Sequence, residues 1–139
     1  MAEEGISVGH VREKLSAAGL VVADSPAGDN VFTVQETESG MTITCALEET
    51  VLFNTLPCLT IDESKITLEL TRKLLDADNG VSSSFFQLYD GPDGKVHIAL
   101  CNFCTLQNLG PEDEDDMLSC LSFLEVDAVS ARELLADYC

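Results

Sequence analysis

Apolar and polar positions recur along the chain with two different periods, and these periods predict its secondary structure. Residues 6–20 place an apolar side chain at every third or fourth position, which is typical of an amphipathic helix. The segments 31–36, 41–49 and 51–59 instead alternate apolar and polar residues, which predicts three β-strands joined as an antiparallel meander. Pro57 is expected to end the pairing of the third strand, because proline has no N–H to donate.

The second half of the chain shows the same change of period. Residues 66–80 return to helical spacing, and Thr60 fits the start of a capping box before them. The segments 84–90 and 95–103 alternate again and are joined by a Gly-Pro-Asp-Gly turn, which predicts a hairpin. From Pro111, a residue tolerated in the first helical turn, the spacing is helical to the C-terminus.

These elements predict one α+β domain over residues 1–139, in the order helix, three strands, helix, two strands, helix. An antiparallel five-stranded sheet with helices packed on it is the economical arrangement. Gly19 and Gly80 are expected to end the first two helices. A second capping pattern, Ser130 with Glu133, leaves open whether the last region is one helix or two.

The charge of the chain restricts its partners. It has 25 acidic and 7 basic residues and a net charge of −18, which repels phosphate backbones and anionic lipid headgroups. Nucleic acid and membranes are therefore not expected as partners. No apolar run reaches the roughly 20 residues that span a bilayer, and the start MAEEGISV lacks the features of a signal peptide. These features predict a cytoplasmic protein with reduced thiols.

Cys101 and Cys104 form a Cys-x-x-Cys pair, which is the strongest candidate for chemistry. Because they continue the strand alternation, we expect them on opposite faces and roughly 10 Å apart. A disulfide needs Cα atoms about 4.4–6.8 Å apart, and one such pair with no nearby histidine is a weak signal for zinc. We interpret both thiols as structural. The alternative hypothesis is a small thiol-dependent redox or metal-binding protein that uses this pair.

The other polar clusters have simpler interpretations. The acidic residues 112–116 fit a first helical turn, where the helix dipole favours negative charge. His10 and His97 have no neighbouring cysteine or serine that would suggest a nucleophile pair, and the serines 82–84 are interpreted as a connector. We therefore assign no catalytic, cofactor-binding or metal-binding residue, expect no cofactor, and expect a protein that is not an enzyme.

The order of elements and the acidity resemble the type III secretion chaperone fold, including the Tir-chaperone group and the YbjN-like proteins. Within this comparison, LLDADNGVSSSFFQLYDGPDGKVHIAL is similar to the family's second helix and the hairpin that follows it. The resemblance covers about residues 6–135. It implies a homodimer that binds a client protein in extended form across exposed apolar surface, without nucleotide and without catalysis.

The resemblance also implies where these contacts lie, and core packing is the alternative role for each residue. The second helix would supply the dimer interface, through Leu68, Leu70, Leu74 and Leu75. The first helix and the sheet would bind the client, through Val11, Leu15, Phe32, Val34, Ile43 and Phe53. There is also a physical reason to expect a partner, because three helices can cover one face of a sheet and leave the other available. The acidity would favour basic client segments.

Overall fold

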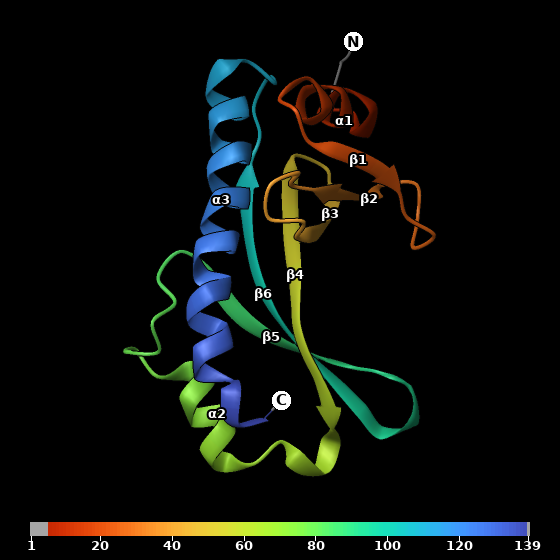
Figure 1. The fold of residues 1–139 in the computed structure, drawn as a ribbon. Coiled ribbons are helices and arrows are strands. Elements are labelled where there is room, and N and C mark those ends of the chain that lie inside the picture. The colour runs from red at the N-terminus through yellow and green to blue at the C-terminus, as the bar shows by residue number, and fades with distance from the viewer. Residues whose placement is uncertain (1–5, 139) are drawn as a thin grey trace.

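The computed structural model describes residues 6–138, so the expectation drawn from the N-terminal MAEEG and the sixth cysteine, Cys139, lie outside the described residues. Within 6–138 the chain forms an α+β fold with three helices and one antiparallel six-stranded sheet (Figure 1). The helices are α1 (Val8–Ala17), α2 (Leu68–Leu75) and α3 (Pro111–Leu134), with the 3-10 turns η1 (Glu63–Lys65), η2 (Pro92–Gly94) and η3 (Ala136–Tyr138). The strands are β1 (Val21–Asp24), β2 (Val31–Gln35), β3 (Thr42–Glu48), β4 (Val51–Asp62), β5 (Phe85–Asp90) and β6 (Lys95–Thr105), arranged in space as β1-β2-β3-β4-β6-β5.

The prediction of five strands is wrong, because β1 forms an additional edge strand. β1 has only four residues, three of them exposed, so it shows no alternation that a sequence pattern could reveal. Gly19 ends α1, as predicted, with φ +98°, a left-handed conformation that glycine adopts without strain. The chain then turns back and pairs with β2, with Val22 opposite Val34.

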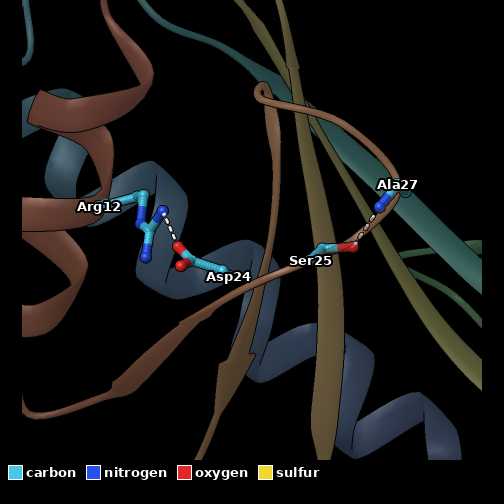
Figure 2. Close-up of polar contacts among 4 residues, drawn as sticks. All are labelled: Arg12, Asp24, Ser25 and Ala27. Carbon is cyan, nitrogen blue, oxygen red and sulfur yellow. Dashed lines mark hydrogen bonds and ion pairs between the residues drawn. The ribbon is translucent and has the colours of Figure 1, made fainter.

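An ion pair joins α1 to the end of β1. Figure 2 shows the Arg12 guanidinium directed at the Asp24 carboxylate, with Nη1 and Oδ1 2.7 Å apart. The same guanidinium lies 5.9 Å from the centre of the Phe32 ring. In the following turn, the Ala27 N–H donates to Ser25 Oγ at 3.2 Å (Figure 2). These contacts hold the short edge strand where its own side chains bury little surface.

The prediction that Pro57 ends strand pairing is also wrong. β4 continues to Asp62, and its pairing with β6 shifts by one residue between Pro57 and Leu59. A bulge of this kind accommodates a residue without an N–H. Since side chains alternate with period two, the shift also changes which face they occupy. Leu56 before the bulge and Ile61 after it are consequently both buried.

α2 is shorter than predicted and begins at a different cap. Thr60 lies in β4, and the N-cap is Thr67, whose Oγ1 accepts a hydrogen bond from the Leu70 N–H at 3.2 Å. The helix ends at Leu75, so Gly80 does not terminate it. Beyond Leu75, Asp and Asn side chains bind nearby backbone groups, which competes with helix formation.

α3 is one continuous helix of 24 residues that crosses β4 and β6 on one side of the sheet (Figure 1). The predicted start at Pro111 is confirmed, whereas Ser130 lies inside the helix and caps nothing. Two buried carboxylates attach loops to this helix. Asp113 Oδ2 accepts the N–H groups of residues 107–109 at 2.7–2.9 Å. Asp127 accepts bonds from Ser82–Ser84, with the Ser84 hydroxyl at 2.6 Å.

The hydrophobic core lies between the sheet and the described helices. Its larger part joins α1 and α3 to β2, β3, β4 and β6, and a smaller part lies under α2. Two asparagines are buried in the larger part, on neighbouring strands. Asn54 Nδ2 donates to Asn102 Oδ1 at 3.1 Å, and Asn102 Nδ2 donates to the Cys120 carbonyl of α3 at 2.8 Å. All three helices of the described region therefore occupy the same face of the sheet.

Candidate functional site: the open face of the sheet

The opposite face of the sheet carries no helix of the described region, and we call it the open face. Strand pairing identifies its residues, because partners in register point to the same side. Phe53 on β4 pairs with Phe103 on β6 and with Ala46 on β3, and Ala46 pairs with Val31 on β2. These four side chains form an apolar row that crosses four adjacent strands.

The apolar row ends in a group of three exposed phenylalanines, which we call the aromatic cluster. Phe53, Phe85 and Phe103 are 40%, 41% and 53% exposed. The rings of Phe53 and Phe103 have centroids 5.7 Å apart, and those of Phe85 and Phe103 6.5 Å apart. Contacts of this kind stabilise a pair by about 0.5–1.5 kcal/mol beyond burial. Each ring nevertheless leaves much of its apolar area in water, which is typical of a surface that binds a partner.

A neutral polar group lies beside the aromatic cluster. Cys101 is 4% exposed and its thiol donates to Gln87 Oε1 at 3.3 Å. The Tyr89 hydroxyl also donates to Gln87 Oε1 and lies 3.5 Å from Cys101 Sγ. Burial, followed by the hydrogen bond to Cys101, raises the pKa of Tyr89, so this hydroxyl stays protonated at neutral pH. The group orders the open face without an activated base or nucleophile among these side chains.

The two thiols of the Cys-x-x-Cys pair occupy opposite faces of β6, as their spacing predicts. Both residues lie within the strand. Cys101 faces the open side, whereas Cys104 lies on the helix side, opposite Leu52 and packed against the core. Cys101 and Cys104 therefore do not converge on one metal ion. Within residues 6–138, no three or more His, Cys, Asp and Glu side chains gather as metal ligands do.

The structure places most of the predicted client-binding residues in the core. These residues are 0–2% exposed, on α1, β2 and β3: Val11, Leu15, Phe32, Val34 and Ile43. They pack between the sheet and the helices, so they present no surface to a client in this structure. Phe53 alone of the predicted set lies on the open face.

The predicted dimer-interface residues divide into two pairs. Leu70 and Leu74 are buried under α2, at 0% and 5% exposure. Leu68 and Leu75 lie on the outer side of the helix, at 75% and 80% exposure. Beside them are side chains of both signs: Glu69, Arg72, Lys73 and Asp76.

Sequence reasoning missed Phe85 and Phe103. The sequence did contain an indication. Phe103 stands at an outward-facing position of its strand, between Asn102 and Cys104, which both point toward the helices. Phe53 stands at such a position on β4. An aromatic residue at an outward position on two strands points to surface recognition, but only the pairing of β4 with β6 brings the two rings together.

One open cleft lies away from this face, between α1 and the loop before α3. It has a volume of about 560 Å³ and is lined by Ile6, His10, Lys14 and Leu109, among others. The lining residues belong to α1, to the segment before it and to the loop before α3, and they include charged, polar and apolar side chains.

Comparison with known proteins identifies the fold. A structure of YbjN from E. coli superposes with a TM-score of 0.69, covering 97% of both chains at 12% sequence identity. The chain has a YbjN-like fold. No protein-family model and no curated protein matches the sequence. At this identity the likeness concerns the fold alone, and YbjN itself carries a provisional assignment as a transcription regulator.

The YbjN-like fold confirms one part of the predicted resemblance. The α+β architecture and its extent along the chain agree with YbjN, whereas the specific resemblance to secretion chaperones stays a prediction. Within residues 6–138, no helix combines the length and apolar character required to cross a bilayer.

Proposed function

We propose that this chain is a cytoplasmic, non-enzymatic protein-binding domain, chaperone-like or regulatory, whose open face holds an extended segment of a client protein. The observation that carries the proposal is the aromatic cluster. Phe53, Phe85 and Phe103 are each at least 40% exposed on a face without a helix. Covering such rings removes apolar area from water, which contributes about 25 cal/mol per Å².

The charge of the chain favours a basic segment as the occupant of this face. A second copy would bring another net charge of −18 against the first, which opposes self-association through the same surface. A segment with alternating apolar and basic side chains would bury its apolar side chains on the rings. Its basic side chains would be attracted by the net negative charge of the chain. Direct binding to DNA is opposed by the same charge, so a regulatory role would act through a protein.

The edge strand β5 supports an extended conformation of the client. β5 is the last strand of the described sheet on the side of the aromatic cluster, and it pairs with β6 alone. An edge strand offers backbone N–H and C=O groups to an added strand. A client strand beside β5 would lie next to Phe85 and extend the apolar row across the sheet.

The proposal includes a homodimer formed through the outer side of α2. Leu68 and Leu75 are one heptad apart on a helix and share that side. Unlike the chain as a whole, this surface has balanced charge, with Glu69 and Asp76 facing Arg72 and Lys73 of a copy placed antiparallel. A two-fold interface requires such self-complementarity. Dimerisation through α2 leaves the open face available to the client.

The experiment starts from partners retained by the full-length chain at low salt and then measures one purified partner directly. Phe103→Ser and Phe85→Ser are each expected to weaken its binding by about tenfold or more, since central aromatic contacts dominate interface energetics. The matched control is Val126→Ser, which removes an apolar side chain that is 67% exposed on α3. Equal affinity for wild type and both Phe variants, or a loss with Val126→Ser alone, would overturn the proposal.

A further inference from the structure

Cys120 of α3 lies directly against strand β6, where the helix crosses the sheet. The Asn102 side chain donates to the Cys120 carbonyl at 2.8 Å, and Asn102 is 6% exposed. The Cys120 thiol lies 3.8 Å from the Phe103 carbonyl oxygen. Two contacts, one from the backbone and one from the thiol, thus hold Cys120 over residues 102–104 of β6.

Cys104 points at the same place from the sheet. It stands opposite Leu52 in the β4–β6 register, on the side of the sheet that α3 covers. Its side chain packs against the core beneath α3, next to the Phe103 carbonyl that the Cys120 thiol contacts. Both residues are half-buried, so a small molecule can reach them, whereas Cys45 is fully enclosed in the core.

The two thiols shift each other's pKa in opposite directions. The side-chain interaction with Cys104 lowers the pKa of Cys120, despite the opposing effects of burial and of Asp116. The same interaction, together with burial and nearby carboxylates, raises the pKa of Cys104. Since the thiolate is the nucleophile in disulfide chemistry, Cys120 is the group that reacts first.

We propose that Cys104 and Cys120 are a redox modification site, at which a reversible disulfide joins β6 to α3. The oxidant is a low-molecular-weight disulfide. The Cys120 thiolate attacks one of its sulfurs, forms a mixed disulfide and expels one thiolate. Cys104 then loses its proton to solvent and attacks Cys120 Sγ, which expels the second thiolate. Two electrons pass from the protein thiols to the oxidant, which leaves as two thiols. A reducing compartment reverses the reaction, as is typical of regulatory rather than structural disulfides.

The inference is independent of the proposed client binding and replaces the earlier thiol hypothesis with a different pair. Cys101 and Cys104 are separated by the sheet, whereas Cys104 lies on the face that α3 covers, where Cys120 contacts the adjacent residues 102 and 103. The Cys-x-x-Cys spacing therefore suggests Cys101 as the disulfide partner of Cys104, whereas the proposed partner is Cys120. The proposed disulfide links residues 16 positions apart in sequence.

The test equilibrates the full-length chain with mixtures of oxidised and reduced glutathione, quenches it with acid, and alkylates it under denaturing conditions. Intact mass should show wild type losing two of its six alkylation sites together, without retained glutathione. Cys101→Ser, the matched control, should still lose two sites. Cys104→Ser should retain one glutathione, on Cys120, because the second step has no nucleophile.

Peptide mapping distinguishes this pair from every other. Chymotryptic cleavage after Phe103 separates Cys101 from Cys104, so the expected crosslink joins a peptide with Cys104 to one with Cys120. Thermal melts of the reduced variants check that each one folds. A paired loss that persists in Cys104→Ser, a crosslink that contains Cys101, or six alkylated thiols in folded wild type at every glutathione ratio would overturn the proposal.

Discussion

At the scale of single residues, buried polar side chains attach loops to helices and strands through hydrogen bonds. Asp113 is 4% exposed, and one of its carboxylate oxygens accepts three backbone N–H groups. Hydrogen bonds to a charged group are stronger than those between neutral groups, so this one oxygen holds the loop of residues 107–109 against the start of α3. The neighbouring Asp115 has an exposed side chain and no such role.

Asp113→Ala is expected to lower the free energy of unfolding by about 1–3 kcal/mol, since it removes the carboxylate that accepts three backbone N–H groups just before α3. Asp115→Ala, which removes the same charge two residues away, should change stability by less than about 0.5 kcal/mol. Urea unfolding followed by circular dichroism measures both values. Equal midpoints for the two variants would contradict the role of Asp113.

At the scale of elements, the ends and irregularities of helices and strands are set by a few backbone positions. Gly19 has φ +98° and lets the chain leave α1 and turn into β1. The bulge between Pro57 and Leu59 lets apolar side chains on both halves of the long strand β4 point toward the helices. Thr67 begins α2 after a turn that the hydrophobic pattern does not reveal. Each irregularity decides which face the following residues occupy.

Gly19→Ala is expected to destabilise the protein by about 1 kcal/mol or more, because alanine is strained at positive φ. Gly9→Ala is the matched control: Gly9 lies inside α1 with open space around its Cα, so alanine should raise stability by up to about 1 kcal/mol. Thermal or urea unfolding of both variants gives the comparison. Destabilisation by both substitutions would contradict this account of the turn after α1.

At the scale of the whole molecule, the net charge and the packing of helices on one face of the sheet determine what the protein can bind. All described helices lie on one face of the sheet, and the aromatic cluster lies on the other. The chain as a whole has a net charge of −18, which opposes the approach of a second copy through this surface. The molecule therefore has an exposed apolar surface, and charge repulsion disfavours self-association through it.

Added salt is expected to stabilise the folded chain, because screening reduces the repulsion among its carboxylates. Raising NaCl from about 10 mM to about 150 mM shortens the Debye length from about 30 Å to about 8 Å. We expect the melting temperature at neutral pH to rise by a few degrees. A non-ionic osmolyte at matched osmolarity is the control. A melting temperature that does not rise with salt, or that rises equally with the osmolyte, would contradict the prediction.

Much of the fold was predictable because it follows from local patterns. The α+β class, the first helix ending at Gly19, the Gly-Pro-Asp-Gly hairpin and the helix beginning at Pro111 all have signatures within about twenty residues of sequence. β1 was not predictable in this way, because its exposed residues carry no alternation. Most of the candidate site was not predictable either, since Phe53, Phe85 and Phe103 come from three strands that only pairing brings together.

The sequence by itself determined the two periods of hydrophobicity, the charge and the separation of Cys101 from Cys104, because each depends on residues close together in the chain. The tertiary structure decided which face of each strand meets the helices. It thereby assigned Val11, Leu15 and Phe32 to the core and Phe103 to the surface. It also placed Cys120 of α3 against the segment of β6 that contains Cys104. Alternation groups side chains into two faces, but only packing between distant elements determines which face is buried.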